Sequence, residues 1–144
     1  MILADVNLLV YAFDSDCTDN PRYLPWLSGV LDGDEEFALA DPVLAGFLRL
    51  VTNTKIMPRP APAEVAMTFV EALLGAEVTR WLPVNRAVWT TLGSWIRADP
   101  GIRGNAVPDA YLAALAVTNG ARLATADRGF ARFPGLRWYD PADR

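Results

Sequence analysis

The first eleven residues constrain the fold more than any other part of the chain. Ile2, Leu3 and Ala4 form an apolar run that is too short for a helix, and Asp5 follows it directly. A run of this kind is typical of a strand buried on both faces of a parallel sheet. Ligands of open parallel sheets bind beyond the carboxyl ends of the strands, so Asp5 stands where a catalytic or metal-binding carboxylate would lie. The alternative is that Asp5 only caps the turn that follows.

Short apolar segments alternate with amphipathic segments along the rest of the chain. Strands are predicted at 2–4, 37–40, 78–82, 122–125 and 136–139, and helices at 8–13, 21–31, 42–52, 64–74, 86–97 and 107–119. This alternation predicts an α/β fold in which helices flank a central parallel sheet of four to five strands. No repeat or linker divides the 144 residues, so we expect a single domain over 1–144.

Local signals predict several helix ends and helix faces. Asn20, Asp41 and Asn85 stand just before predicted helices and are expected to be their N-caps. In the helix predicted at 86–97, the apolar spacing assigns Trp89 and Ile96 to the buried stripe.

The absence of histidine excludes several kinds of enzyme. Without histidine, a Ser-His-Asp triad, a Cys-His pair and a histidine-based ribonuclease mechanism are impossible. Cys17 is the only cysteine, which excludes an internal disulfide and a cysteine-rich zinc site. Hydrolytic chemistry would therefore depend on carboxylates, hydroxyls, arginines or a metal ion with oxygen ligands. Such ligands favour hard cations such as Mg2+ or Mn2+.

The chain shows no membrane or export signal. No apolar run approaches the roughly 18 residues of a membrane span, and the N-terminus lacks the basic and apolar regions of a signal peptide. We therefore expect a cytoplasmic protein without a membrane segment.

Charge is distributed unevenly along the chain. Residues 1–48 hold nine acids and one arginine, a net charge of −8, whereas residues 97–137 hold six arginines and three aspartates, a net charge of +3. Arginine suits bidentate contacts with phosphate. We predict that Arg103, Arg128 and Arg97 contact phosphate groups of a ligand, with ordinary solvated surface charge as the alternative for each of them.

Two further aspartates stand at positions comparable to that of Asp5. Asp109 falls in the first turn of the helix at 107–119, and Asp127 follows the strand at 122–125. Taken singly, Asp109 could compensate a helix dipole and Asp127 could be a turn residue. Three aspartates at one edge of a sheet would repel one another unless a cation neutralised them, so together they favour a metal site.

Four stretches that span nearly the whole chain carry a family resemblance: DVNLLVYAFD (5–14), FLRLVTN (47–53), PDAYLAALA (108–116) and TADRGFARFPGLRW (125–138). With them the chain resembles the PIN-domain ribonucleases, specifically the VapC toxins of bacterial toxin–antitoxin pairs. The resemblance implies a PIN fold, a Mg2+- or Mn2+-dependent endoribonuclease, a VapB-type antitoxin partner and a homodimer. It also implies that Asp5, Asp109 and Asp127 are the metal ligands.

The chain departs from the family pattern at two positions of this site. Gly46 stands where many members have a glutamate, and Gly129 stands where many have a further aspartate. The missing carboxylates leave open whether one or two metal ions bind. Asn7 and Thr125 could hydrogen-bond the ligands or their waters, although ordinary turn hydrogen bonds would explain them equally well.

Two other classes of function compete with a ribonuclease. One is a PIN-like module that binds RNA or a protein partner without cleaving RNA. The other is a phosphatase with an aspartyl nucleophile, which is disfavoured because Asn7 occupies the position of its usual second aspartate.

The acidic N-terminal third suggests where an antitoxin would dock. The helices predicted at 21–31 and 42–52 could present Trp26, Leu27, Leu44 and Leu48 along an acidic groove. A basic amphipathic peptide would suit such a groove. The alternative is that these four side chains belong to the core.

Overall fold

The computed structural model describes residues 1–143, and its centre is one parallel sheet. The strands are β1 (Ile2–Ala4), β2 (Phe37–Leu39), β3 (Thr79–Trp81), β4 (Arg122–Ala124) and β5 (Trp138–Tyr139). Their order across the sheet is β3-β2-β1-β4-β5, and every neighbouring pair is parallel. Leu3 of β1 is in register with Ala38 of β2 and with Leu123 of β4. The predicted parallel α/β sheet is therefore confirmed, with β1 at its centre.

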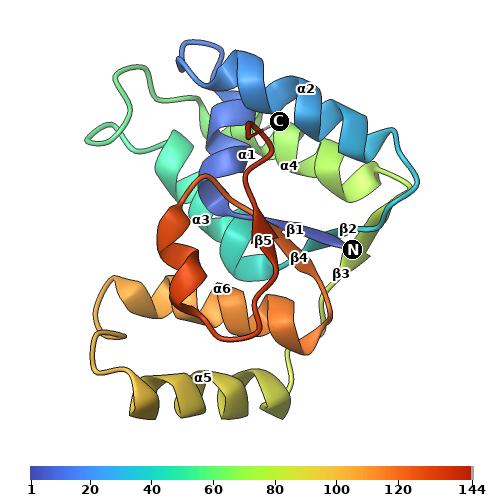
Figure 1. The fold of residues 1–144 in the computed structure, drawn as a ribbon. Helices are drawn as coiled ribbons and strands as arrows, with labels where there is room; N and C mark the ends of the chain where they lie inside the picture. Colours follow the sequence, from blue (N-terminus) through green and yellow to red (C-terminus); the bar gives the residue numbers. More distant parts are fainter. Residues whose placement is uncertain (144) are drawn as a thin grey trace.

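Helices cover both faces of the sheet. They are α1 (Val6–Phe13), α2 (Asn20–Leu31), α3 (Asp41–Val51), α4 (Ala63–Gly75), α5 (Arg86–Ala98) and α6 (Ala106–Thr118), followed by the 3-10 helix η1 (Arg128–Arg132). Figure 1 shows α1, α2 and α4 above the sheet and α5 and α6 below it. The run 112–116 of α6 is completely buried, because α6 lies next to α5 on one side and the sheet on the other. None of the described helices is long and apolar enough to cross a membrane.

The outer face of α5 differs from the prediction. Trp89 is 60% exposed and Ile96 is 40% exposed, so their assignment to the buried stripe is wrong. Only Val88, Leu92 and Trp95 of this helix are buried. Because α5 is the outermost helix and packs on α6, one narrow stripe is covered.

Two of the three predicted N-caps are wrong. Asn85 caps α5 as expected, since its Oδ1 accepts the backbone N–H of Ala87 at 2.9 Å. Asn20 instead lies inside α2, and its side-chain amide donates to the carbonyl oxygens of Tyr11 and Ala12 at 2.9 and 3.0 Å. It therefore satisfies free carbonyls at the end of α1. Asp41 is the first residue of α3 and makes no capping hydrogen bond.

The docking groove predicted between helices 21–31 and 42–52 is also wrong. Leu27 and Leu44 are buried in the core, and Trp26 and Leu48 are half-buried against it. The helix α1 packs against both α2 and α3. Leu27 and Leu44 thus belong to the core, as the alternative held, whereas Trp26 and Leu48 each line a separate cavity at the surface.

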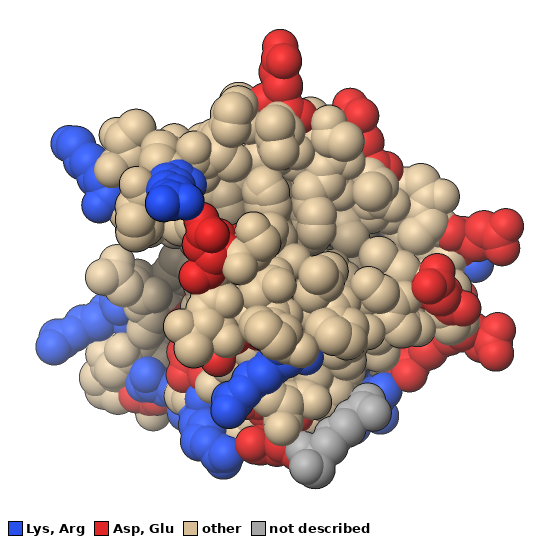
Figure 2. Space-filling model, turned by 90° about the horizontal axis from the view of Figure 1, so that it is seen from above, with Lys and Arg blue, Asp and Glu red and all other residues tan. Residues whose placement is uncertain are grey.

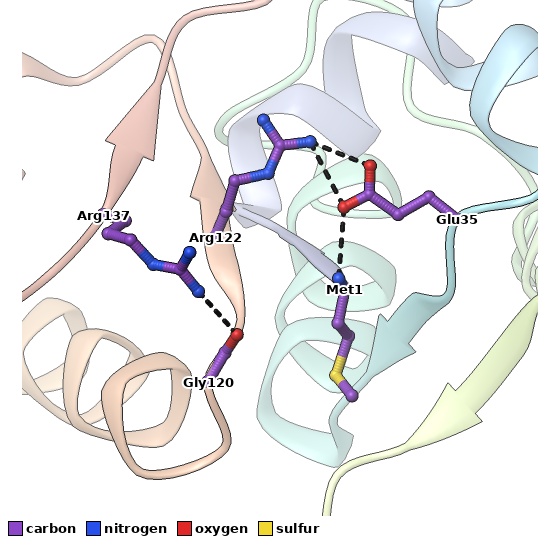
Figure 3. Close-up of polar contacts among 5 residues, drawn as sticks. All are labelled: Met1, Glu35, Gly120, Arg122 and Arg137. Atoms are coloured by element: carbon purple, nitrogen blue, oxygen red, sulfur yellow. Dashed lines mark hydrogen bonds and ion pairs between the residues drawn. The ribbon is translucent and has the colours of Figure 1, made fainter.

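A network of charges joins the amino ends of the strands. The Met1 amino group lies 3.1 Å from Oε2 of Glu35, and the Arg122 guanidinium lies 2.9 Å from Oε1 of the same carboxylate. The Arg137 guanidinium donates to the carbonyl oxygen of Gly120 at 2.8 Å. Figure 3 shows that Met1, Arg122 and Glu35 tie the starts of β1 and β4 to the segment before β2, while Arg137 bonds the segment before β4.

Candidate active site

Asp5 lies at the carboxyl end of the central strand and is almost completely buried. Its side chain is 6% exposed, and Oδ2 accepts a hydrogen bond from the Thr125 hydroxyl at 2.9 Å. Its backbone N–H donates to the carbonyl oxygen of Ala124 in the neighbouring strand. The side chain makes no capping hydrogen bond with α1, so the simple capping role is not what the structure shows.

The turn after β4 brings Thr125 and Asp127 to the same edge. The Thr125 hydroxyl, which donates to Asp5, also accepts the backbone N–H of Asp127 at 3.0 Å. Oδ1 of Asp127 accepts the N–H of Gly129 at 2.8 Å and so caps η1. Asp127 therefore is a turn residue, as one alternative held, but Oδ2 has no hydrogen-bonding partner among the described residues.

The third aspartate comes from helix α6. Asp109 lies in the first turn of α6, where it also suits the helix dipole. It lines a cleft of about 410 Å³ together with Asp5 and Asn7, and α3 forms the facing wall. A larger cavity, about 930 Å³, lies between α2 and β5 and is lined by none of the three sequence-predicted aspartates.

Burial and repulsion by neighbouring acids raise the pKa of two of these carboxyl groups, those of Asp5 and Asp109. The pKa of Asp5 is raised to about 6, mainly by burial and also by the charges of Asp109 and Asp127, while the hydrogen bond from Thr125 opposes the shift. Burial and the charge of Asp127 also raise the pKa of Asp109. The three aspartates thus act on one another electrostatically, as the sequence predicted, and a bound cation would relieve the repulsion.

The donor set suits a hard cation that keeps part of its water shell. Three carboxylates, the Asn7 amide and the Thr125 hydroxyl are all oxygen donors, which Mg2+ and Mn2+ prefer. Within residues 1–143, no three acidic, histidine or cysteine side chains stand close enough together to hold a metal ion among them. Mg2+ typically uses one or two carboxylates and several waters, so an open arrangement fits it.

The two glycines at usual carboxylate positions are closely surrounded. A Cβ at Gly46 would lie 3.3 Å from Cγ2 of Val6, and a Cβ at Gly129 would lie 2.9 Å from Oδ1 of Asp127. A larger side chain at either position would require its neighbour to move. The structure thus has no carboxylate at either place where a second metal ion would need one.

The three arginines predicted to contact RNA differ in their surroundings. The Arg103 side chain is exposed in the loop before α6 and has no hydrogen bond or ion pair with a described residue. Arg128 pairs with Asp143 at 2.9 Å on the surface. The Arg97 guanidinium folds back over Gly93 of its own helix.

Sequence reasoning missed one cation that lines the cleft, Arg49. Arg49 follows Gly46 by three residues on α3, so the two residues share one face of the helix. Because Gly46 stands at a position of the predicted site, this spacing could have identified Arg49 as a residue of the cleft. Figure 2 shows Lys and Arg side chains around a hollow on the left, the side where the strands end in Figure 1, and many Asp and Glu side chains toward the right.

Comparison with known proteins decides the family. The model of the PIN domain family matches residues 2–136. The chain belongs to the PIN-domain family. Within that family it is 40% identical over 143 residues to ribonuclease VapC43 of Mycobacterium tuberculosis, covering 99% of this chain and 97% of the relative. It is 34% identical over 148 residues to ribonuclease VapC37 of the same species, covering 98% and 97%. The chain is thus a member of the VapC group of PIN domains.

Solved structures of PIN-domain proteins share the fold. VapBC2 from Rickettsia felis, bound to a DNA fragment from its promoter, aligns with a TM-score of 0.71 at 21% identity and covers 97% of this chain and 98% of that chain. VapC20 of Mycobacterium tuberculosis, described as a sarcin–ricin loop cleaving toxin, aligns with a TM-score of 0.68 at 15% identity and covers 95% and 99%. These similarities confirm the predicted PIN fold.

Proposed function

We propose that this VapC-family chain is an endoribonuclease toxin that cleaves cellular RNA with the help of Mg2+ or Mn2+ held by Asp5, Asp109 and Asp127. The observation that carries the proposal is the cluster itself. Three carboxylates act on one another at the carboxyl edge of the sheet, and Asp5 is buried there without a cationic partner among the described residues. Such a cluster is costly for folding and is typical of functional sites.

Asp5 and Thr125 have different roles in the proposed hydrolysis of RNA. Asp5 is ionised above its pKa of about 6, so it carries a negative charge at neutral pH. The Thr125 hydroxyl holds this carboxylate in one orientation and positions the backbone of Asp127. When bound, a divalent cation lowers the pKa of water and offsets charge on the phosphate. Since no histidine is present to activate the ribose 2′-hydroxyl, we expect products with 5′-phosphate and 3′-hydroxyl ends.

Cleavage of RNA by purified protein tests this proposal. Wild type, Asp5→Asn and Asp34→Asn would each be incubated with total RNA and either Mn2+ or EDTA. The Mn2+ concentration would be about 5 mM, which is enough to saturate weak metal sites. Asp34 is an exposed aspartate outside the cleft and serves as the matched control. We expect cleavage by wild type and Asp34→Asn only with metal, and none by Asp5→Asn. If the wild type binds RNA but leaves it intact with Mn2+, the non-cleaving PIN-like module is correct.

We further propose a VapB-type antitoxin and a homodimer as the assemblies of this protein, which we place in the cytoplasm. The solved VapBC2 complex supports the antitoxin partner. The homodimer is supported by exposed apolar side chains that a second copy of the chain could bury: Trp81, Val84 and Trp89. An antitoxin that reaches the aspartates should inhibit less as Mg2+ rises. Light scattering after gel filtration measures the oligomer, and a monomer at micromolar concentration would contradict the dimer.

A further inference from the structure

Arg49 supplies the charge of the wall that faces the aspartates. Helix α3 contributes six residues to the cleft, and Arg49 is the only charged residue among them: Pro42, Val43, Ala45, Gly46, Arg49 and Leu50. Asp5 and Asp109 line the same cleft. The charged side chains of the cleft are therefore one arginine and two aspartates.

The Arg49 side chain is exposed and has no partner within residues 1–143. It makes no ion pair with Asp5 or Asp109, although all three line the cleft. Glu64 lines an adjoining groove between α3 and α4 and forms no ion pair with Arg49 either. By contrast, Arg122 and Arg132 are each paired with a carboxylate at the surface. Arg49 is thus available to an incoming anion.

A structural role for Arg49 is the alternative. It lies in the last turn of α3, where a cation favourably meets the negative end of the helix dipole. A dipole role would need only a positive charge near the helix end. It would not require the side chain to line the same cleft as the aspartates.

We propose that Arg49 binds a phosphate of the RNA backbone next to the phosphate that is cleaved. This inference rests on the proposed function and adds a substrate-binding residue to it. Because Arg49 lines the same cleft as Asp5 and Asp109 and forms an ion pair with neither, an RNA strand in the cleft could place one phosphate at the carboxylates and a neighbouring phosphate at the guanidinium. The planar fork of arginine matches phosphate oxygens in two parallel hydrogen bonds, which lysine does not reproduce.

RNA binding without cleavage tests this directly. A labelled single-stranded RNA of about ten nucleotides, long enough for one such site, would be titrated in EDTA with wild type, Arg49→Gln, Arg49→Lys and Arg86→Gln. Arg86 is the matched control, because it is an exposed arginine at the far end of α5 and lines no part of the cleft. We expect Arg49→Gln to weaken binding about tenfold and to lower the salt slope by about 0.7. Arg49→Lys should bind with intermediate affinity, and Arg86→Gln should bind like wild type.

Thermal melts and cleavage separate the alternatives. A dipole role predicts a lower Tm for Arg49→Gln with unchanged RNA affinity and salt slope, and that result would overturn the inference. A wild type that binds RNA but does not cleave it with Mn2+ would overturn the proposed function, while the binding of Arg49→Gln would still decide the role of Arg49. A wild type without measurable RNA binding would overturn both.

Discussion

The two edges of the sheet hold acidic side chains in opposite electrostatic settings. At the amino edge, Glu35 is partly exposed and meets two cationic groups; although burial acts to raise its pKa, hydrogen bonds from the Met1 amino group and Arg122 lower it overall. At the carboxyl edge, Asp5 is buried, and its charged neighbours are the acids Asp109 and Asp127. The first arrangement stabilises the fold slightly, whereas the second opposes it.

This difference indicates which edge of the sheet has the features of a functional site. Compensated surface charge is common and contributes little, while a buried carboxylate whose charged neighbours are all acids is typical of a functional site. Removing a carboxylate should therefore impair function at the carboxyl edge and affect only stability, weakly, at the amino edge.

The largest expected effect is on RNA cleavage. Asp109→Asn should reduce the rate on the order of 10³-fold, because it removes a proposed ligand of the cation. Glu35→Gln, which changes the amino edge in the same chemical way, should cleave like wild type. Gel-based initial rates at a fixed Mn2+ concentration measure both, and equal losses in the two variants would remove the functional distinction between the edges.

The next effect is on the pH dependence of stability without metal. The pKa of Asp5 is raised from 3.8 to about 6 in the folded state, so its contribution to stability is present at pH below about 4 and is lost as the pH rises through 6. At pH 7.5, a charged Asp5 should cost about 3 kcal/mol that Asp5→Asn does not incur. Urea unfolding in EDTA at several pH values measures the difference between the two proteins. Parallel curves for wild type and Asp5→Asn would show that Asp5 is not destabilising.

Metal binding should relieve the same repulsion. Mn2+ at about 100 times its Kd should stabilise the wild type by about 2.7 kcal/mol and raise its Tm. In the double variant Asp5→Asn/Asp109→Asn, the Tm should rise much less. An equal shift in both proteins would place the bound metal elsewhere on the molecule.

The smallest effect is expected at the amino edge. Glu35→Gln should lower the free energy of unfolding at pH 7 by less than about 1 kcal/mol, and added salt should shrink the difference. Because the pKa of Glu35 is lowered on folding, this stabilisation should fade as the pH drops below about 4.5. Chemical denaturation at low and high salt checks it, and a loss of several kcal/mol would mean that this edge is as specialised as the other.

Much of the fold was predictable because its signals are local. The apolar run before Asp5, the spacing of apolar residues and the cap at Asn85 each depend on a few adjacent residues. The face of a helix that becomes buried depends instead on what packs against it. Trp89 and Ile96 fit an apolar stripe in sequence, yet only Val88, Leu92 and Trp95 of α5 are buried, and Trp89 stays largely exposed although its ring contacts Tyr111.

The sequence by itself determined which groups are available for chemistry at the site: aspartates at the ends of predicted elements, no histidine, and glycine at positions 46 and 129. Only the tertiary structure decided how these groups act on one another. The pairing of β1 with β4 brings the Thr125 hydroxyl to Asp5 across 120 positions of the chain, and the packing of α3 brings Arg49 to the facing wall. The physical reason is that burial and electrostatic interaction depend on distance through space, which a strand order sets and a local pattern does not.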